Sequence, residues 1–155
     1  MEDGNSFCQV TYDSQNNVIE KKWFFVNTYK EHRDCGPSTI QYYSNGQVKR
    51  MVWKTCGCIG YLVRDANGDL VNGPHVIDYH ANGVVKSLTW YSDGRIARFN
   101  GPAYMEFDHN GKLMKEEWRG DLTDAEMYRR DNRKPSYMES YQNGDLTIAK
   151  YNEDI

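Results

Sequence analysis

The sequence predicts an all-β fold: an antiparallel meander of tandem β-hairpin repeats that forms an elongated, twisted sheet. The first observation behind this prediction is a recurring spacing. A Gly-Pro or Lys-Pro pair is followed by a glycine nine residues after the proline and by a large aromatic residue seven residues after that glycine. The second observation is that aromatic residues make up 14% of the chain although only 39% of residues are hydrophobic. Such a composition is typical of a thin sheet that carries large rings on its faces.

The repeat pattern divides the chain into units of one repeat domain, residues 1–155. Segment 10–23 fits the pattern without the proline, and Asn16 takes the place of the glycine. The expected units are 8–36, 37–73, 74–101, 102–134 and 135–155. Their length varies after the aromatic residue, which is where repeat proteins place insertions. The recurring residues are Pro37, Pro74, Pro102 and Pro135, then Gly46, Gly83, Gly111 and Gly144, then Trp53, Trp90, Trp118 and Tyr151.

Each unit predicts one hairpin. Apolar and polar residues alternate in Thr39–Tyr42, Val76–Tyr79 and Tyr104–Phe107, which indicates strands. The Asn-Gly pairs that follow predict tight turns, because both residues tolerate positive φ. In the returning strand, the residue two positions after the glycine and the aromatic residue seven positions after it have opposite parity. This conflict means either that both faces of the sheet are partly covered or that a β-bulge shifts the register. We expect the recurring aromatic residues to pack as a ladder between units.

Two segments depart from the pattern. Residues 59–72 contain their own Asn67-Gly68 pair and predict an extra short hairpin inserted in the second unit. Residues 123–126 read Thr-Asp-Ala-Glu, which fits a capping box and predicts a short helix near residues 124–130.

The run Gly-Pro-Ala-Tyr-Met-Glu-Phe at 101–107, with Asn110-Gly111 and Trp118, resembles the MORN-like β-hairpin repeats in a divergent bacterial or viral form. The resemblance extends over roughly residues 8–151. It implies an elongated antiparallel sheet that serves as a scaffold or binding surface, and it implies no catalytic residues. By the same analogy, the chain would be a phage or viral protein that binds a host or defence component in the host cytoplasm.

The sequence contains few patterns that carry chemistry. Cys56-Gly57-Cys58 is a single C-x-C pair, whereas zinc sites use paired knuckles, so we expect reduced thiols there and at Cys8 and Cys35; metal binding by Cys56 and Cys58 stays open. The four histidines fall at different repeat positions and are expected at the surface or at strand edges. Asp78, Glu106 and Glu139 are expected on a solvated strand face. We therefore expect no catalytic residue, no cofactor, no metal ligand and no enzyme.

Three rings follow Trp23 in an expected connection: Phe24, Phe25 and Tyr29. A thin loop buries three rings poorly, so these residues are a candidate contact patch for a partner, with completion of the local core as the alternative. The prediction is a non-enzymatic protein-interaction or structural module with a protein partner, whose sheet edges also allow a homo-oligomer.

Two other functions stay open, a hydrolase acting on a sugar or nucleotide in an aromatic groove and a nucleic-acid-binding sheet. The net charge of −3 gives no reason to expect nucleic acid, and the basic residues at 129–134 form only a short, interrupted run. No apolar run approaches the ~20 residues that span a bilayer, and the first residues lack the features of a secretory signal. We therefore expect a cytoplasmic protein.

Overall fold

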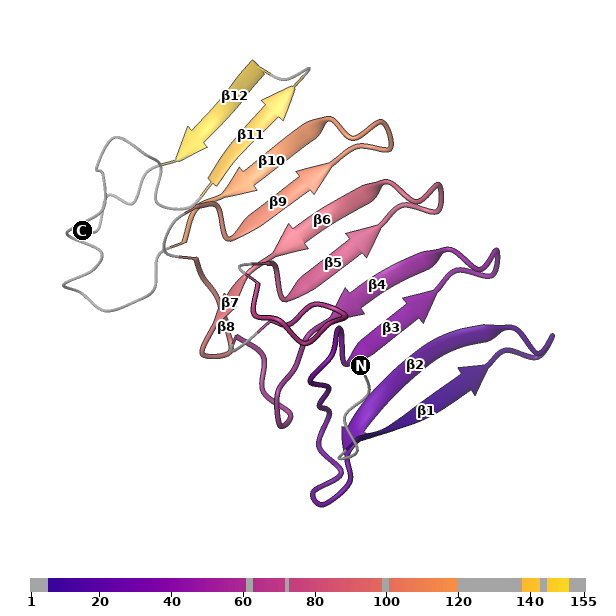
Figure 1. Ribbon diagram of the computed structural model, residues 1–155. Helices are drawn as coiled ribbons and strands as arrows, with labels where there is room; N and C mark the ends of the chain where they lie inside the picture. The colour runs from indigo at the N-terminus through magenta and orange to yellow at the C-terminus, as the bar shows by residue number, and fades with distance from the viewer. Residues whose placement is uncertain are drawn as a thin grey trace.

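The computed structural model describes residues 6–60, 63–71, 73–98, 101–119, 138–142 and 145–150. These residues form the predicted antiparallel meander, in which ten strands make one sheet in the order of the chain (Figure 1). Two further strands, β7 (Tyr91–Ser92) and β8 (Arg95–Ile96), pair with each other. The helix expected near residues 124–130 lies outside the described residues. The strands of the large sheet are β1 (Ser6–Tyr12), β2 (Val18–Phe25), β3 (Thr39–Tyr42), β4 (Val48–Val52), β5 (Val76–Tyr79), β6 (Val85–Thr89), β9 (Tyr104–Phe107), β10 (Leu113–Glu117), β11 (Met138–Gln142) and β12 (Asp145–Lys150).

The hairpin turns carry a residue with positive φ at the predicted place. Gly46, Gly83 and Gly111 have φ of 85°, 88° and 86°, and Asn16 has φ of 66°. The amide of each donates to a carbonyl three residues earlier, as from Gly46 to Tyr43 at 3.0 Å. Asparagine tolerates the left-handed region better than other non-glycine residues, which explains how Asn16 replaces glycine in the first unit.

The predicted β-bulge is present in all five hairpins of the large sheet. In each hairpin the register shifts at the same place, so that one residue of the returning strand has no cross-strand partner. The bulge at Lys49 brings Val48 and Trp53 onto the same face, which resolves the parity conflict. The bulged residues are Ile19, Lys49, Lys86, Met114 and Thr147.

One face carries a row of tryptophans near the strand ends that lie opposite the hairpin turns. Along the row, each tryptophan alternates with the residue that follows a proline: Trp23, Ser38, Trp53, His75, Trp90 and Ala103. The amides of Trp23, Trp53 and Trp90 donate to the carbonyls of Ser38, His75 and Ala103 at 2.8, 2.9 and 2.8 Å. Ser38 and Ala103 are fully buried, and their small side chains leave room for the rings on either side. We call this the tryptophan row.

The connections between units cover the tryptophan row. The guanidinium of Arg33 lies 3.8 Å from the ring centroid of Trp23, and that of Arg98 lies 4.0 Å from Trp90. Each arginine also donates to the carbonyl of the following proline, four residues on. A Cβ atom at Gly101 would come within 2.9 Å of the Arg98 guanidinium, so glycine before the proline makes space for this stacked arginine. Stacking and hydrogen bonding together tie these two connections to the sheet.

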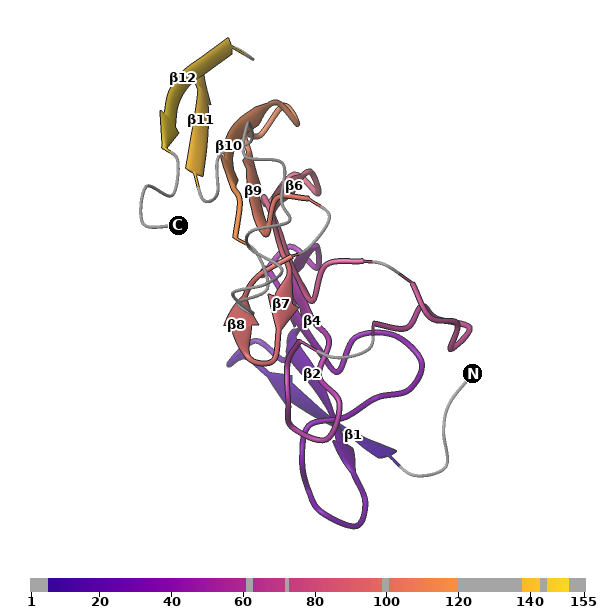
Figure 2. The same cartoon turned by 90° about the vertical axis from the view of Figure 1, so that its left-hand side faces the viewer.

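Small hairpins also form within the connections. The insertion predicted at 59–72 contains the Gly68 turn, closed by an isolated bridge between Arg64 and Leu70. Two more turns were not predicted, Cys56-Gly57 and Asp93-Gly94. In both, the two central residues have positive φ, as a type I′ turn requires. In Figure 2 these connections project from the sheet near its lower end, while the hairpins twist progressively from β1 to β12.

Replacing Trp90 with alanine tests the packing of the tryptophan row. Trp90 is 7% exposed. Loss of the ring should therefore lower the free energy of unfolding by about 3–5 kcal/mol, measured by urea denaturation. Leu70→Ala is the matched control: Leu70 is 60% exposed, and the expected change there is below about 0.5 kcal/mol. A Trp90→Ala effect as small as that of the control would contradict a packed row.

Candidate functional site

The expected contact residues are distributed over two faces of the sheet. Phe24 and Phe25 belong to β2 and not to a loop as predicted, because β2 continues two residues beyond Trp23 and pairs with Phe7 and Ser6 of β1. Neighbouring residues of a strand point to opposite faces. Phe25 therefore packs on the face of the tryptophan row, edge-on to His32 with 5.3 Å between ring centroids. The position of Phe25 fits the alternative to a contact patch, in which the ring completes the local core.

Phe24 and Tyr29 meet around a third ring on the other face. Phe24 stacks on Phe7 with 5.5 Å between centroids, and Tyr29 meets Phe7 edge-on at 5.9 Å. We call Phe7, Phe24 and Tyr29 the aromatic cluster. Phe7 was not among the predicted contact residues. Its position could have been found by extending the first hairpin's register outward from Asn16, which places Phe7 directly across from Phe24.

The aromatic cluster is open to solvent. Phe7 is 40% exposed and Tyr29 is 73% exposed. Tyr29 has φ of 56°, in the left-handed region that bulky residues rarely adopt. Hydrogen bonds of 2.8 Å, from the Tyr29 amide to the Phe25 carbonyl and from the Phe25 amide to the Lys30 carbonyl, hold its loop closed. The strained backbone at Tyr29 therefore accompanies a loop conformation that exposes a large ring to solvent.

The aromatic cluster lies on an edge strand. β1 ends the sheet and pairs only with β2 among the described strands. Its sequence, SFCQVTY, contains no charged residue and no proline, the usual protections of a sheet edge. The amide of Trp23 points away from β1, because it donates to the carbonyl of Ser38. Val10 of β1 lies opposite Lys21, which is two residues before Trp23 on the same strand. Because backbone direction alternates along a strand, the amide of Val10 faces the open edge.

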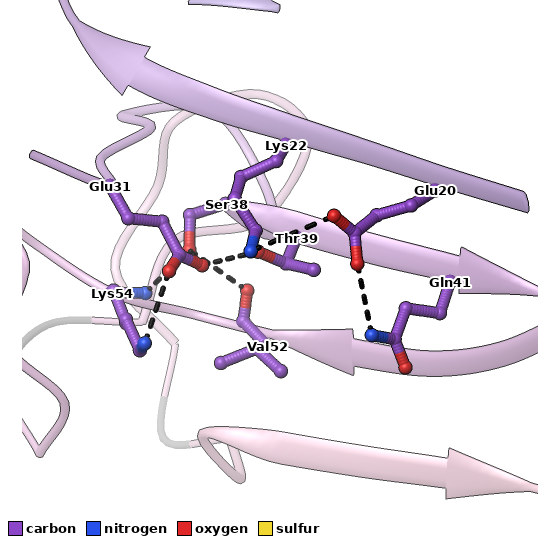
Figure 3. A network of polar contacts seen from close by, with 8 residues as sticks. All are labelled: Glu20, Lys22, Glu31, Ser38, Thr39, Gln41, Val52 and Lys54. Atoms are coloured by element: carbon purple, nitrogen blue, oxygen red, sulfur yellow. Dashed lines mark hydrogen bonds and ion pairs between the residues drawn. The ribbon is translucent and has the colours of Figure 1, made fainter. Parts of the chain in front are cut away.

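A polar network anchors the loop that carries Tyr29 (Figure 3). Glu31 accepts hydrogen bonds from the hydroxyls of Ser38, at 2.9 Å, and Thr39, and its carboxylate pairs with Lys54 at 3.0 Å. Burial alone would raise the pKa of Glu31. The hydrogen bonds from Thr39, Lys54 and Ser38 outweigh burial and hold the pKa of Glu31 below its usual value. As a carboxylate, Glu31 therefore fastens the connection to the start of β3 and to Lys54, two residues beyond β4.

Several charged and histidine side chains differ from their expected surface positions. His32 and His75 are buried, and the Nδ1 atom of each accepts a backbone amide, from Cys56 at 3.1 Å and from Tyr91 at 3.0 Å. Asp78 is not simply solvated, since Arg50 donates two hydrogen bonds to its carboxylate at 2.6 and 3.2 Å. These groups satisfy one another within the fold, and periodicity alone could not reveal their contacts.

The cysteines are free thiols: Cys35 is buried, and Cys8, Cys56 and Cys58 are exposed. Within the described ranges, no three His, Cys, Asp or Glu side chains are grouped so as to hold a metal ion. The same part of the chain contains no helix with the length and apolar character needed to cross a membrane. Comparison of the chain with family models, curated proteins and solved structures finds no match.

Glu31→Gln tests the polar network through its pH dependence. Because the pKa of Glu31 is lower in the folded chain than in the unfolded chain, its stabilisation is complete above the unfolded pKa and is lost as the pH falls through the folded pKa. At neutral pH the substitution should lower the free energy of unfolding by about 1–3 kcal/mol. The difference from wild type should shrink in denaturant titrations below about pH 4.

Glu20→Gln is the control for this titration. Glu20 pairs with Lys22 across 3.6 Å, and both side chains are more exposed than Glu31, so a smaller loss is expected. A Glu31→Gln deficit that stays constant from neutral to acidic pH would show that the carboxylate charge contributes nothing.

Proposed function

We propose that the chain is a non-enzymatic protein-binding module that takes an extended segment of another protein onto the edge of β1. The observation that carries the proposal is the exposed aromatic cluster on an edge strand without charge. An extended segment that adds to a sheet edge gains main-chain hydrogen bonds, and its alternate side chains give specificity. The partner segment would carry apolar side chains at alternate positions, so that one of them reaches Phe7 and Tyr29.

The chemistry of the cluster supports a protein partner. Large exposed rings dominate the binding energy of protein interfaces, because they bury much area and lose little conformational freedom. Four basic side chains of the described units already pair with carboxylates: Lys22 with Glu20, Arg50 with Asp78, Lys54 with Glu31 and Arg119 with Glu117. Compensated charges of this kind are poorly suited to binding a phosphate backbone.

Strand geometry favours a different protein over a second copy of this chain. If β1 paired antiparallel with its own copy over all seven residues, Gln9 would lie on the two-fold axis. Phe7 of one copy would then face Thr11 of the other, and the two aromatic clusters would remain apart and uncovered. A partner strand of another sequence can place an apolar side chain against the cluster itself.

Two substitutions on β1 test the proposal in affinity capture from native lysate, with the full chain as bait and quantitative mass spectrometry as readout. Val10→Pro removes an outward amide while sparing the hydrogen bonds to β2, and Phe7→Ala removes the central ring. Both should reduce capture of the same partner about tenfold or more. Val10→Thr, which keeps the amide, and Leu70→Ala, which removes an exposed apolar side chain elsewhere, should capture it like wild type.

Partners captured equally by all variants would contradict the proposal, provided that circular dichroism shows the variants folded. Sedimentation tests whether a second copy of this chain occupies the edge of β1. A wild-type dimer that Val10→Pro converts to monomer would assign the edge to a second copy instead.

A further inference from the structure

The geometry points to Cys56 as a nucleophilic thiol, activated by His32 and positioned to add to an activated alkene. Cys56 Sγ lies 3.8 Å from Nδ1 of His32, and the other ring nitrogen, Nε2, donates to Asp34 at 2.8 Å. The three residues thus present a thiol, an imidazole and an orienting carboxylate in line. This is the constellation that activates cysteine in proteins, and no repeat position predicts it.

The hydrogen bonds determine which nitrogen of His32 carries the proton. Nδ1 accepts the amide of Cys56 at 3.1 Å, so it is unprotonated, while Nε2 holds the hydrogen that Asp34 accepts. His32 is 5% exposed, which keeps the ring in this orientation. The neutral imidazole therefore directs its Nδ1 lone pair toward Cys56, where it accepts the backbone amide and where the thiol lies beside that bond as a second donor.

The backbone at Cys56 is strained in a way that a purely structural turn does not need. Cys56 has φ of 49° at the first central position of a two-residue turn, where Asn, Asp or Gly is preferred. A cysteine here has a conformational cost, and the turn leaves its side chain exposed beside a buried histidine. An exposed thiol against an oriented base has both access and a proton acceptor.

The same turn argues against acyl hydrolysis. The amide of Cys56 donates to His32, that of Gly57 to the Glu31 carbonyl at 2.8 Å, and that of Cys58 to the Thr55 carbonyl at 3.0 Å. In the resting structure each of these three amides already has an acceptor, so the turn contains no preformed oxyanion hole. The chemistry that fits is a single addition, which makes Cys56 a site of covalent modification without turnover.

The addition balances without a further reactant. The thiol proton passes to Nδ1 of His32, whose lone pair gives up the hydrogen bond from the Cys56 amide. Sulfur forms a bond to the β-carbon of the alkene, and the π electrons move toward the adjacent carbonyl. The α-carbon then takes up a proton, and His32 returns to its neutral form. Asp34 acts as a positioning residue, since its hydrogen bond keeps the imidazole aligned and stabilises the imidazolium while it exists.

Acrylamide is the probe, applied to the folded full chain and followed by peptide mass spectrometry over time. Cys58 is the internal control, because it is exposed, lies two residues away in the same turn, and donates its amide to Thr55 where Cys56 donates to His32. The variants Cys58→Ser and Cys56→Ser report each thiol separately. Cys56 should react about tenfold or more faster than Cys58, and the two rates should converge in urea.

His32→Gln removes the base and should bring the Cys56 rate down to that of Cys58. His75→Gln is the matched control, because His75 is similarly buried and accepts an amide through Nδ1, but the amide is that of Tyr91 and not of a cysteine. Asp34→Asn should lower the reaction rate of Cys56 and leave the rate of Cys58 unchanged. This variant tests the activation by His32 if His32→Gln fails to fold. Equal rates for the two thiols in the folded wild type, or an unchanged rate ratio in Asp34→Asn, would overturn the proposal.

Discussion

The sheet depends on one hydrogen bond that recurs from hairpin to hairpin: the amides of Trp23, Trp53 and Trp90 each donate to the carbonyl of the residue after the next proline. The bonds from Trp23, Trp53 and Trp90 have nearly equal lengths of 2.8, 2.9 and 2.8 Å. A thin sheet has no second layer to bury its residues against, so neighbouring units must supply the packing. The same bond places a small or flat side chain, Ser38, His75 or Ala103, beside a tryptophan where the chain re-enters the sheet from a connection.

Both candidate sites, the aromatic cluster and the pair of Cys56 and His32, lie where connections leave the sheet. β2 runs past Trp23, and that extension brings Phe24 to Phe7 and starts the loop of Tyr29. The chain then returns over the tryptophan row, where Glu31 is tied to Ser38 and Lys54 and His32 comes beneath the next connection. One anchored loop therefore separates an open aromatic surface on one face from a thiol and imidazole pair on the other.

The repeated part of the fold was predictable because its signals are local. Asn-Gly spacing marks the turns, and alternation marks the strands. The parity conflict between Val48 and Trp53 allowed a bulge as one of two explanations, and Lys49 provides it. The Asp93-Gly94 turn also has a local signal, since Asp-Gly favours a type I′ turn, but it lies outside the repeat spacing. The contact between His32 and Cys56 was beyond prediction, because it joins two connections of different length and no period relates them. Phe25 was assigned to a patch because strand β2 was expected to end at Trp23.

Hydrogen exchange of the tryptophan amides tests the central claim most directly. If the bonds between units hold the sheet together, the amides of Trp23, Trp53 and Trp90 should exchange only through global unfolding and rank with the slowest in the chain. Their protection should be uniform, since each amide makes the same bond in its own unit. Exchange of these amides as fast as that of the hairpin-turn amides, such as Asn45 and Asn82, would contradict the account and would show the hairpins to be independent of one another.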